Sequence, residues 1–337
     1  MKKSTRKIIL ILAAFLGFII VAIFAGTNRE TGGYINMHEH MQGLDNVEVY
    51  LDSIEPLGFE KTILLGSPRV TLFQRGGFED YDDNNDELLK IHEKYPEKFE
   101  VLCTTYWYDE EQVEKAEECW KRGAKGIKLY NGHGSFYDLP LDHENMLPLY
   151  EFIQEKGLIL LIHVNGNKYL DEFAHVLEMY PDMKVICPHF CLMSKKLSQL
   201  EILMEEFPNL YTDMSFGYIE YTAAGFKRFS KSVEKFRPFV ELYQDRIFFG
   251  TDQVITDVKT KNHPEFLEEV FSAYMEILTE PQFKFETTWP MSYDETYEGL
   301  QLDEDTLQTI LKDSPQKLLD SVPEYELPEV PAEAPEA

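Results

Sequence analysis

Two kinds of hydrophobic pattern alternate along residues 33–320. Short apolar runs rich in β-branched residues are typical of buried strands, and runs with apolar residues every three or four positions are typical of amphipathic helices. The pattern predicts eight strands, over residues 34–41, 61–66, 99–107, 125–130, 158–164, 183–190, 210–215 and 247–250. A helix is predicted after each strand, most clearly over residues 109–122, 169–180 and 196–207, with a last one beginning near Pro264.

Eight strand–helix units within about 250 residues are what a (β/α)8 TIM barrel requires, whereas an open doubly wound sheet more often stops at five or six strands. No Gly-x-Gly-x-x-Gly motif follows an early strand, so the fingerprint of a dinucleotide-binding fold is missing. The predicted fold class is therefore α/β, with a TIM barrel over residues 31–320. In such a barrel the active site lies at the carboxyl ends of the strands.

The two ends of the chain have different patterns. Four basic residues precede an uninterrupted apolar run over residues 8–25, which is long enough for a membrane-spanning helix and longer than the core of a usual signal peptide. Residues 1–30 are predicted to be an uncleaved single-pass anchor with a cytoplasmic N-terminus and an extracytoplasmic catalytic domain. A removed signal peptide, which would give a secreted protein, is the alternative. Residues 321–337, rich in Pro, Glu and Ala, are predicted to be a disordered tail.

Composition narrows the possible partners. A formal net charge of -28 leaves no basic surface for a nucleic-acid backbone, so a small-molecule substrate is the better expectation. The four cysteines lie in strand-like or helix-like runs, and Cys187 and Cys191 would be too far apart to bridge along an extended segment. Four buried thiols are expected, with one long-range disulfide left open. The sequence also leaves open a homo-oligomer.

Histidines gather at the predicted strand ends. His38 and His40 share one side of the first strand because side chains alternate along a strand. His163 ends the fifth strand, His189 the sixth and Asp252 the eighth. Three imidazoles and one carboxylate suit a borderline divalent ion such as zinc, which activates water when one coordination position stays open. A remaining histidine could move a proton near neutral pH.

In these motifs the chain resembles the amidohydrolase superfamily, specifically the group that includes aminocarboxymuconate-semialdehyde-decarboxylase-like enzymes. The resemblance covers residues 33–320 and rests on the ordered segments NMHEH, GAKGIKLY, LLIHVN, ICPHF, NLYTDMS and FFGTD. It implies metal ligation by His38, His40, His163 and Asp252, with His189 as the catalytic acid or base. In two-metal relatives, His189 would be a ligand and Asp252 the base.

Lys128 ends the fourth strand, where some two-metal members of the superfamily carry a carbamylated lysine. A single metal ion is favoured, in which case Lys128 could pair with a carboxylate or hold an anionic substrate. Four further residues are weaker candidates for substrate binding, each with a structural alternative. Arg69 could pair with surface carboxylates, Trp107 and Tyr130 could simply pack, and His133 could lie in a glycine-rich loop away from the site. Asp213 could orient a ligand or cap an element.

The predicted function is metal-dependent hydrolysis of a small amide, lactone or ester by metal-activated water. A non-oxidative decarboxylase on the same site is one alternative, because the motifs do not separate the two reactions. A non-catalytic barrel that serves as a membrane-anchored scaffold is the other, although a scaffold would not need a set of ligands. The insert over residues 281–302 has no recognisable pattern and could cap the barrel mouth.

Overall fold

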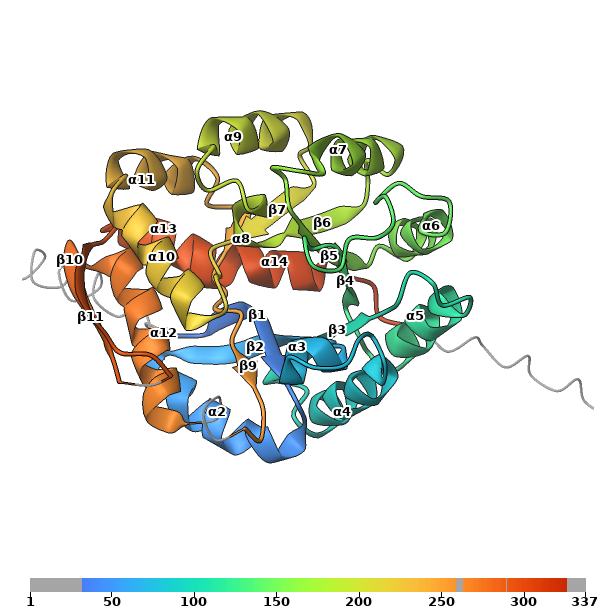
Figure 1. Cartoon of the computed structure of the whole chain (residues 1–337), viewed down its shortest axis with the longest axis horizontal. Helices are drawn as coiled ribbons and strands as arrows, with labels where there is room; N and C mark the ends of the chain where they lie inside the picture. Colours follow the sequence, from blue (N-terminus) through green and yellow to red (C-terminus); the bar gives the residue numbers. More distant parts are fainter. Residues whose placement is uncertain (1–31, 259–262, 289, 326–337) are drawn as a thin grey trace, which may run out of the picture. The chain divides into compact units, whose positions relative to one another are not determined.

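The computed structural model describes residues 32–258, 263–288 and 290–325. A row of parallel strands is surrounded by helices (Figure 1), with neighbours in the order β8-β7-β6-β5-β4-β3-β2-β1-β9. The strands are β1 Tyr34–Met41, β2 Phe59–Leu65, β3 Phe99–Thr104, β4 Gly126–Gly132, β5 Ile159–Val164, β6 Lys184–Cys187, β7 Leu210–Asp213, β8 Ile247–Phe248 and β9 Val254–Ile255. Almost every strand residue is buried, as expected for parallel strands covered by helices.

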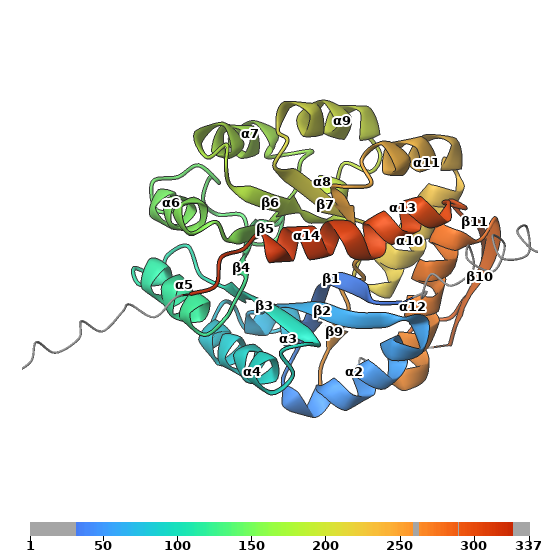
Figure 2. The same cartoon turned by 180° about the vertical axis from the view of Figure 1, so that it is seen from behind.

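Helices follow the strands in the predicted alternation. They are α2 Val47–Ile54, α3 Arg69–Phe73, α4 Tyr81–Lys94, α5 Gln112–Lys121, α6 Leu147–Lys156, α7 Leu170–Met179, α8 Pro188–Cys191, α9 Leu197–Glu206, α10 Ile219–Ser230, α11 Val233–Leu242 and α12 Pro264–Thr279. The closing segment forms α13 Glu304–Gln308, the π-helical turn η3 Thr309–Asp313 and α14 Ser314–Asp320. In Figure 2, α14 crosses in front of the strands, and both η3 and α14 contact β1.

The two ends of the row of strands meet at β1. The N–H of Met37 donates to the carbonyl of Phe249 at 2.9 Å, and the N–H of Asp252 donates to the carbonyl of His38 at 2.9 Å. Both bonds join β1 to the segment that directly follows β8, and β9 then pairs with His40 and Met41. The prediction of a TIM-barrel-like α/β fold is therefore confirmed.

The buried carboxylate of Glu39 supports the same junction from the helix side of β1. It accepts hydrogen bonds from the amide of Asn36 at 2.8 Å and from the hydroxyl of Thr251, which lies just after β8. Burial raises the pKa of Glu39 to about 8. Both hydrogen bonds reach Oε1, and through them Glu39 links the first strand to the segment after β8, while the buried Oε2 has no partner among the described residues.

The expectation of four thiols is wrong, whereas the one disulfide left open is present between Cys103 and Cys119. The structure pairs Cys103 with Cys119 and Cys187 with Cys191. The expectation for the second pair assumed an extended chain as far as residue 190, but β6 ends at Cys187. The next residues turn in the left-handed region, so the Cα atoms of Cys187 and Cys191 lie only 5.1 Å apart, within bridging distance.

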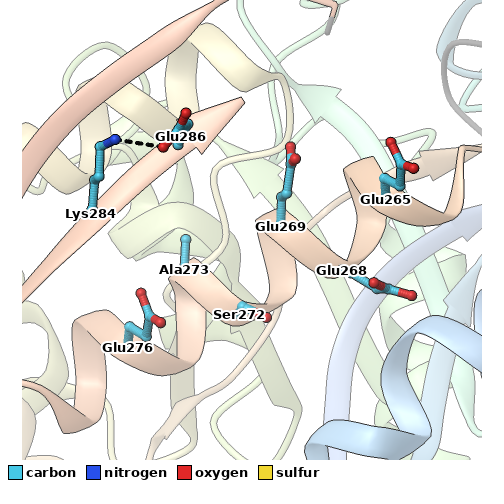
Figure 3. Close-up of a pocket in the computed structure, with 8 residues that line it drawn as sticks. All are labelled: Glu265, Glu268, Glu269, Ser272, Ala273, Glu276, Lys284 and Glu286. Atoms are coloured by element: carbon cyan, nitrogen blue, oxygen red, sulfur yellow. Dashed lines mark hydrogen bonds and ion pairs between the residues drawn. The ribbon is translucent and has the colours of Figure 1, made fainter. Parts of the chain in front are cut away.

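The insert over residues 281–302 forms a hairpin of β10 Gln282–Thr287 and β11 Tyr293–Glu298. The hairpin lies against the outer helices α10 and α12, where Phe283 and Phe285 pack on Phe226. Its exposed face borders an acidic hollow along α12, where Lys284 pairs with Glu286 at 2.5 Å (Figure 3). The contacts place this insert on the outside of the barrel, in contrast to the expected cap.

The ends of the chain are only partly described. The predicted anchor over residues 1–30 lies outside the described residues, and within those that are described no helix is long and apolar enough to span a bilayer. Residues 321–325, at the start of the predicted tail, pack on the barrel. Val322 is buried, the Trp120 indole donates to the carbonyl of Pro323 at 3.1 Å, and Lys184 donates to the carbonyl of Ser321 at 2.7 Å. The rest of the tail lies outside the described residues.

Gly126 provides a test of the strand packing. A β-carbon at this position would lie 2.0 Å from the carbonyl oxygen of Ile159 in the neighbouring strand. We expect Gly126→Ala to lower the free energy of unfolding by about 3 kcal/mol, because backbone must move to relieve the overlap. The measurement is urea unfolding followed by circular dichroism. Gly77→Ala is the control, since nothing lies within 4 Å of its β-carbon position. Equal stability of the two variants would contradict this account of the barrel.

Candidate metal centre

Three imidazoles converge on one carboxylate at the carboxyl ends of the strands. Asp252 Oδ1 lies 2.9 Å from His40 Nε2 and 3.1 Å from His38 Nε2, and Asp252 Oδ2 lies 3.5 Å from His189 Nε2. His38 and His40 share one side of β1, as the sequence predicts, while the other two residues follow β6 and β8. The structure therefore brings together residues from the first, sixth and eighth strands.

Each of these imidazoles is held through Nδ1. His38 donates to Asp213 Oδ2 at 2.7 Å. His40 lies 2.8 Å from the Ser67 hydroxyl, and His189 lies 2.8 Å from the Ser215 carbonyl. The Ser67 hydroxyl already donates to the carbonyl of Leu65, so it can only accept from His40. All three rings thus carry a proton on Nδ1 and direct Nε2 toward Asp252.

Asp213 is the common anchor behind this arrangement. Its fully buried carboxylate accepts from His38, from the backbone N–H of His189 at 2.9 Å, and from the Ser215 hydroxyl at 2.6 Å. Burial disfavours its charge, but the positive His38 imidazole and these donors outweigh that effect and hold the pKa of Asp213 well below its usual value. Asp213 therefore orients an imidazole, the role that the sequence left as one of two alternatives.

The charges around His38 favour a cation. Burial opposes its protonation, but Asp252 and Asp213 on either side outweigh burial and raise the pKa of His38 to about 9. Burial lowers the pKa of His40 to about 4 and also lowers the pKa of His189. Without a metal, the His38 imidazolium therefore offsets part of the negative charge of Asp252 and Asp213.

Unusual backbone conformations shape the rim of the site. His189, Phe190, Cys191 and Leu192 all have positive φ, between 51° and 58°, and the Cys187–Cys191 disulfide spans this turn. Left-handed geometry costs non-glycine residues about 1–2 kcal/mol each, so the surrounding contacts must enforce it. Asp252 also has a positive φ, and its carboxylate lies so close to Gly217 that a β-carbon there would be 2.6 Å from Oδ2.

His163 and His133 extend the row of imidazoles. The rings of His163 and His189 have centroids 4.9 Å apart, and those of His133 and His163 are 4.5 Å apart. Burial, followed by the neighbouring imidazoles of His189 and His133, lowers the pKa of His163 well below its usual value. The structure thus brings His133 beside the site, although its loop position alone did not decide this.

The residues fit a divalent metal ion. Ligand atoms of His38, His189 and Asp252 all lie within 4.8 Å of one another. The Nε2 atoms of His38 and His163 are buried and form no hydrogen bond, so each can bind a metal ion when its ring is deprotonated at that nitrogen. This group contains the predicted ligands His38 and Asp252 but not His40 or His163, and it includes His189, which was expected to be the acid or base. His40 contacts the same carboxylate oxygen as His38.

Comparison with known proteins identifies the family. The amidohydrolase family model matches residues 46–320, which is most of the chain. The chain belongs to the amidohydrolase family. The match begins after β1, so the association of His38 and His40 with this amidohydrolase site rests on the geometry. No curated protein sequence matches the chain significantly.

Solved structures share the fold of this amidohydrolase. An uncharacterized TIM-barrel protein from Bordetella bronchiseptica is 16% identical, with a TM-score of 0.56 over 86% of this chain and 99% of that chain. A manganese complex of 5-carboxyvanillate decarboxylase from Novosphingobium aromaticivorans is 13% identical, with a TM-score of 0.51 over 87% and 97%. A zinc-bound amidohydrolase from Burkholderia multivorans is 11% identical, with a TM-score of 0.53 over 86% and 99%. At these identities the likeness concerns the fold.

Lys128 and Tyr130 project from β4 beside the amidohydrolase site. Lys128 is 1% exposed, and burial lowers its pKa to about 8. Its Nζ lies 4.6 Å from the ring centroid of Tyr130, and it forms no ion pair with any side chain within the described parts of the chain. The Tyr130 hydroxyl donates to the carbonyl of Gly66, while its ring lies 6.4 Å from that of His40.

Two of the weaker candidates have structural partners instead. Arg69 pairs with Asp80 at 2.9 Å on the exposed surface, which was its structural alternative. Trp107 is 2% exposed, and its indole N–H donates to Asp138 at 2.7 Å. The site residues that sequence reasoning missed are Ser67 and Ser215. Their only sequence signal is a position just beyond a strand end, shared with many ordinary serines.

We expect Asp213→Asn to weaken zinc binding by about 10–100-fold, because His38 would lose the acceptor that fixes its tautomer. The measurement is competition with a chromophoric chelator. Asp142→Asn is the matched control: Asp142 contacts His175 Nδ1 at the same 2.7 Å, but on the surface. Thermal unfolding of both variants separates loss of affinity from loss of folding. Unchanged affinity in a folded Asp213→Asn protein would contradict the proposed anchor.

Proposed function

We propose that this amidohydrolase hydrolyses a small amide, lactone or ester with a single bound divalent ion, most simply zinc. The observation that carries the proposal is the set of three imidazoles, each tethered at Nδ1, with Nε2 directed at the Asp252 carboxylate. A barrel that served only as a scaffold would not need three separately anchored rings around a buried acid. The zinc- and manganese-bound structures with the same fold are consistent with this choice of ion.

We assign His38, His40, His163 and Asp252 as the ligands, and His189 as the residue that moves a proton at Nε2. A bound divalent ion would supply a Lewis acid for the carbonyl group and lower the pKa of a water molecule. Because burial lowers its pKa, His189 is neutral near pH 7 and can accept a proton. The Ser215 carbonyl holds the opposite nitrogen as a donor and so keeps Nε2 free. If two ions bind, His189 would become a ligand and Asp252 the base, and Lys128 would bridge the ions only as its carbamate.

The purified protein should contain one zinc-class ion per chain by elemental analysis, and a chelator should abolish its hydrolysis of simple lactones and esters. Re-addition of zinc should restore activity. His38→Ala should lose the metal, whereas His175→Ala, on the exposed surface, should retain it. Absence of zinc, manganese, iron and cobalt would favour the scaffold alternative. Two ions per chain would favour a modified Lys128.

A decarboxylase is the second candidate. Lys128 favours it, because a buried ammonium group that has no ion-pair partner among the described residues can hold a carboxylate close to the metal ligands. The similar fold of 5-carboxyvanillate decarboxylase is compatible with this reading. Lys128 would then position the substrate carboxylate, and His189 would deliver the proton to the carbon atom that loses carbon dioxide.

The isotopic fate of water separates the two reactions. For a hydrolase, the product formed in 18O-labelled water should contain one labelled oxygen atom, without release of carbon dioxide. For a decarboxylase, carbon dioxide should be released, and deuterium from heavy water should appear on carbon. Each outcome supports one reaction and contradicts the other. Lys128→Met should impair the decarboxylase more than the hydrolase, because only the former requires a carboxylate at that ammonium.

The extracytoplasmic location stays a proposal. Two disulfides, Cys103–Cys119 and Cys187–Cys191, support it because disulfides persist mainly in oxidising compartments. The second bridge spans the turn that carries His189, so an oxidising environment would also suit the site.

A further inference from the structure

The loops after β4 and β5 bring several hydrogen-bond donors together at the edge of the site. The Asn165 side-chain nitrogen and the Lys168 ammonium both lie 4.0 Å from the position that a β-carbon of Gly134 would occupy. Gly134 follows His133, whose ring contacts that of His163. We call Asn165 and Lys168, which lie beside Gly134, the Asn165–Lys168 donor cluster. Only the imidazole of His133 separates this cluster from His163, a proposed metal ligand.

The orientation of Asn165 is fixed by its own loop. Its side-chain oxygen accepts the backbone N–H of Asn167 at 3.2 Å, and its carbonyl accepts the N–H of Lys168 at 2.8 Å and of Tyr169 at 3.0 Å. The oxygen is therefore occupied, and the amide NH2 group is left facing Gly134. No acceptor contacts this NH2 group within residues 32–258, 263–288 and 290–325.

The Lys168 ammonium also has no carboxylate partner among the described residues. In a chain with net charge -28, several described lysines have carboxylate partners, such as Lys115 with Asp109. Lys168 pairs with no carboxylate among the residues that the structure places. Nearby Glu172 is already occupied by the Tyr137 hydroxyl and the backbone N–H of Leu141. The loops thus present an ammonium and an amide donor with no protein acceptor opposite them.

His133 adds a further donor to the same loop. Its Nδ1 accepts the backbone N–H of Ser135 at 3.1 Å, so the proton of the neutral ring lies on Nε2. The space over Gly134 is open, since a β-carbon there would make only ordinary contacts. One positive charge with neutral donors matches a singly charged group better than a dianion.

We propose that the Asn165–Lys168 donor cluster binds a carboxylate that the substrate carries away from its reacting group. The inference rests on the proposed function and deepens it: the substrate is an amide, lactone or ester with a carboxylate substituent. Lys168 provides the positive charge, and the fixed amide of Asn165 provides a hydrogen bond that orients the carboxylate. The rest of the substrate would then extend past His163 toward the other metal ligands.

The test uses 4-fluorobenzoate as probe and 4-fluorobenzamide as its uncharged control, with binding followed by 19F NMR on metal-free and zinc-loaded protein. We expect the benzoate to bind both forms and the benzamide to bind at least tenfold more weakly. Lys168→Met should weaken benzoate binding about tenfold or more, as expected for loss of a charged hydrogen bond.

Gly134 provides a matched pair of variants. Gly134→Asp places a carboxylate against Asn165 and Lys168 and should block benzoate binding, whereas the equally sized Gly134→Asn should retain it. Benzoate binding that is absent in the wild type, or unaffected by both Lys168→Met and Gly134→Asp, overturns the proposal. Binding that disappears only on metal removal also overturns it. If the protein holds no metal yet binds benzoate through Lys168, the proposed function fails while this inference stands.

Discussion

The hydrogen bond from the N–H of Asp252 to the carbonyl of His38 is the contact on which the rest of the site depends. It joins the segment after β8 to β1, and it places the carboxylate of Asp252 beside the imidazole of the residue to which its backbone is bonded. The hydrogen bond that closes the barrel therefore also assembles the site. With β2 on its other side, β1 is fixed along both edges, so His38 and His40 cannot rotate away from the mouth.

The closed site contains two buried carboxylates whose negative charge requires a positive partner. Asp213 and Asp252 are both held ionised. Burial lowers the pKa values of His40, His163 and His189, so these rings are not protonated to compensate the two negative charges. In the absence of a metal, the His38 imidazolium and the nearby Lys128 ammonium are the positive groups that interact with them. A divalent cation at the same place would satisfy both carboxylates and use the lone pairs that the Nδ1 tethers direct inward. The hydroxyl and carbonyl partners of these rings therefore matter as much as the rings themselves.

Much of this arrangement could be predicted from the sequence, because it follows from periodicity. Alternation along β1 placed His38 and His40 on one side, and the rule that parallel strands end at a common mouth brought Asp252 and His189 to them. The turn after Cys187 could not be predicted in the same way. The four consecutive left-handed residues, 189–192, include no glycine that would indicate a turn in the sequence. The sequence therefore predicts an extended segment in which Cys187 and Cys191 lie too far apart to bridge. The roles of Ser67 and Ser215 could not be predicted, because the role of a serine depends on which residue it contacts in the folded protein.

The long separation of the joined segments has a consequence for biosynthesis. Glu39 and Thr251, which contact each other at the junction, are 212 residues apart in the chain. While the polypeptide emerges, β1 has one unpaired edge until the segment after β8 appears, and during that interval no complete coordination sphere exists. Loading with metal must therefore be among the last steps of maturation, and a nascent chain stalled before residue 252 would present an exposed strand edge for quality-control factors to recognise.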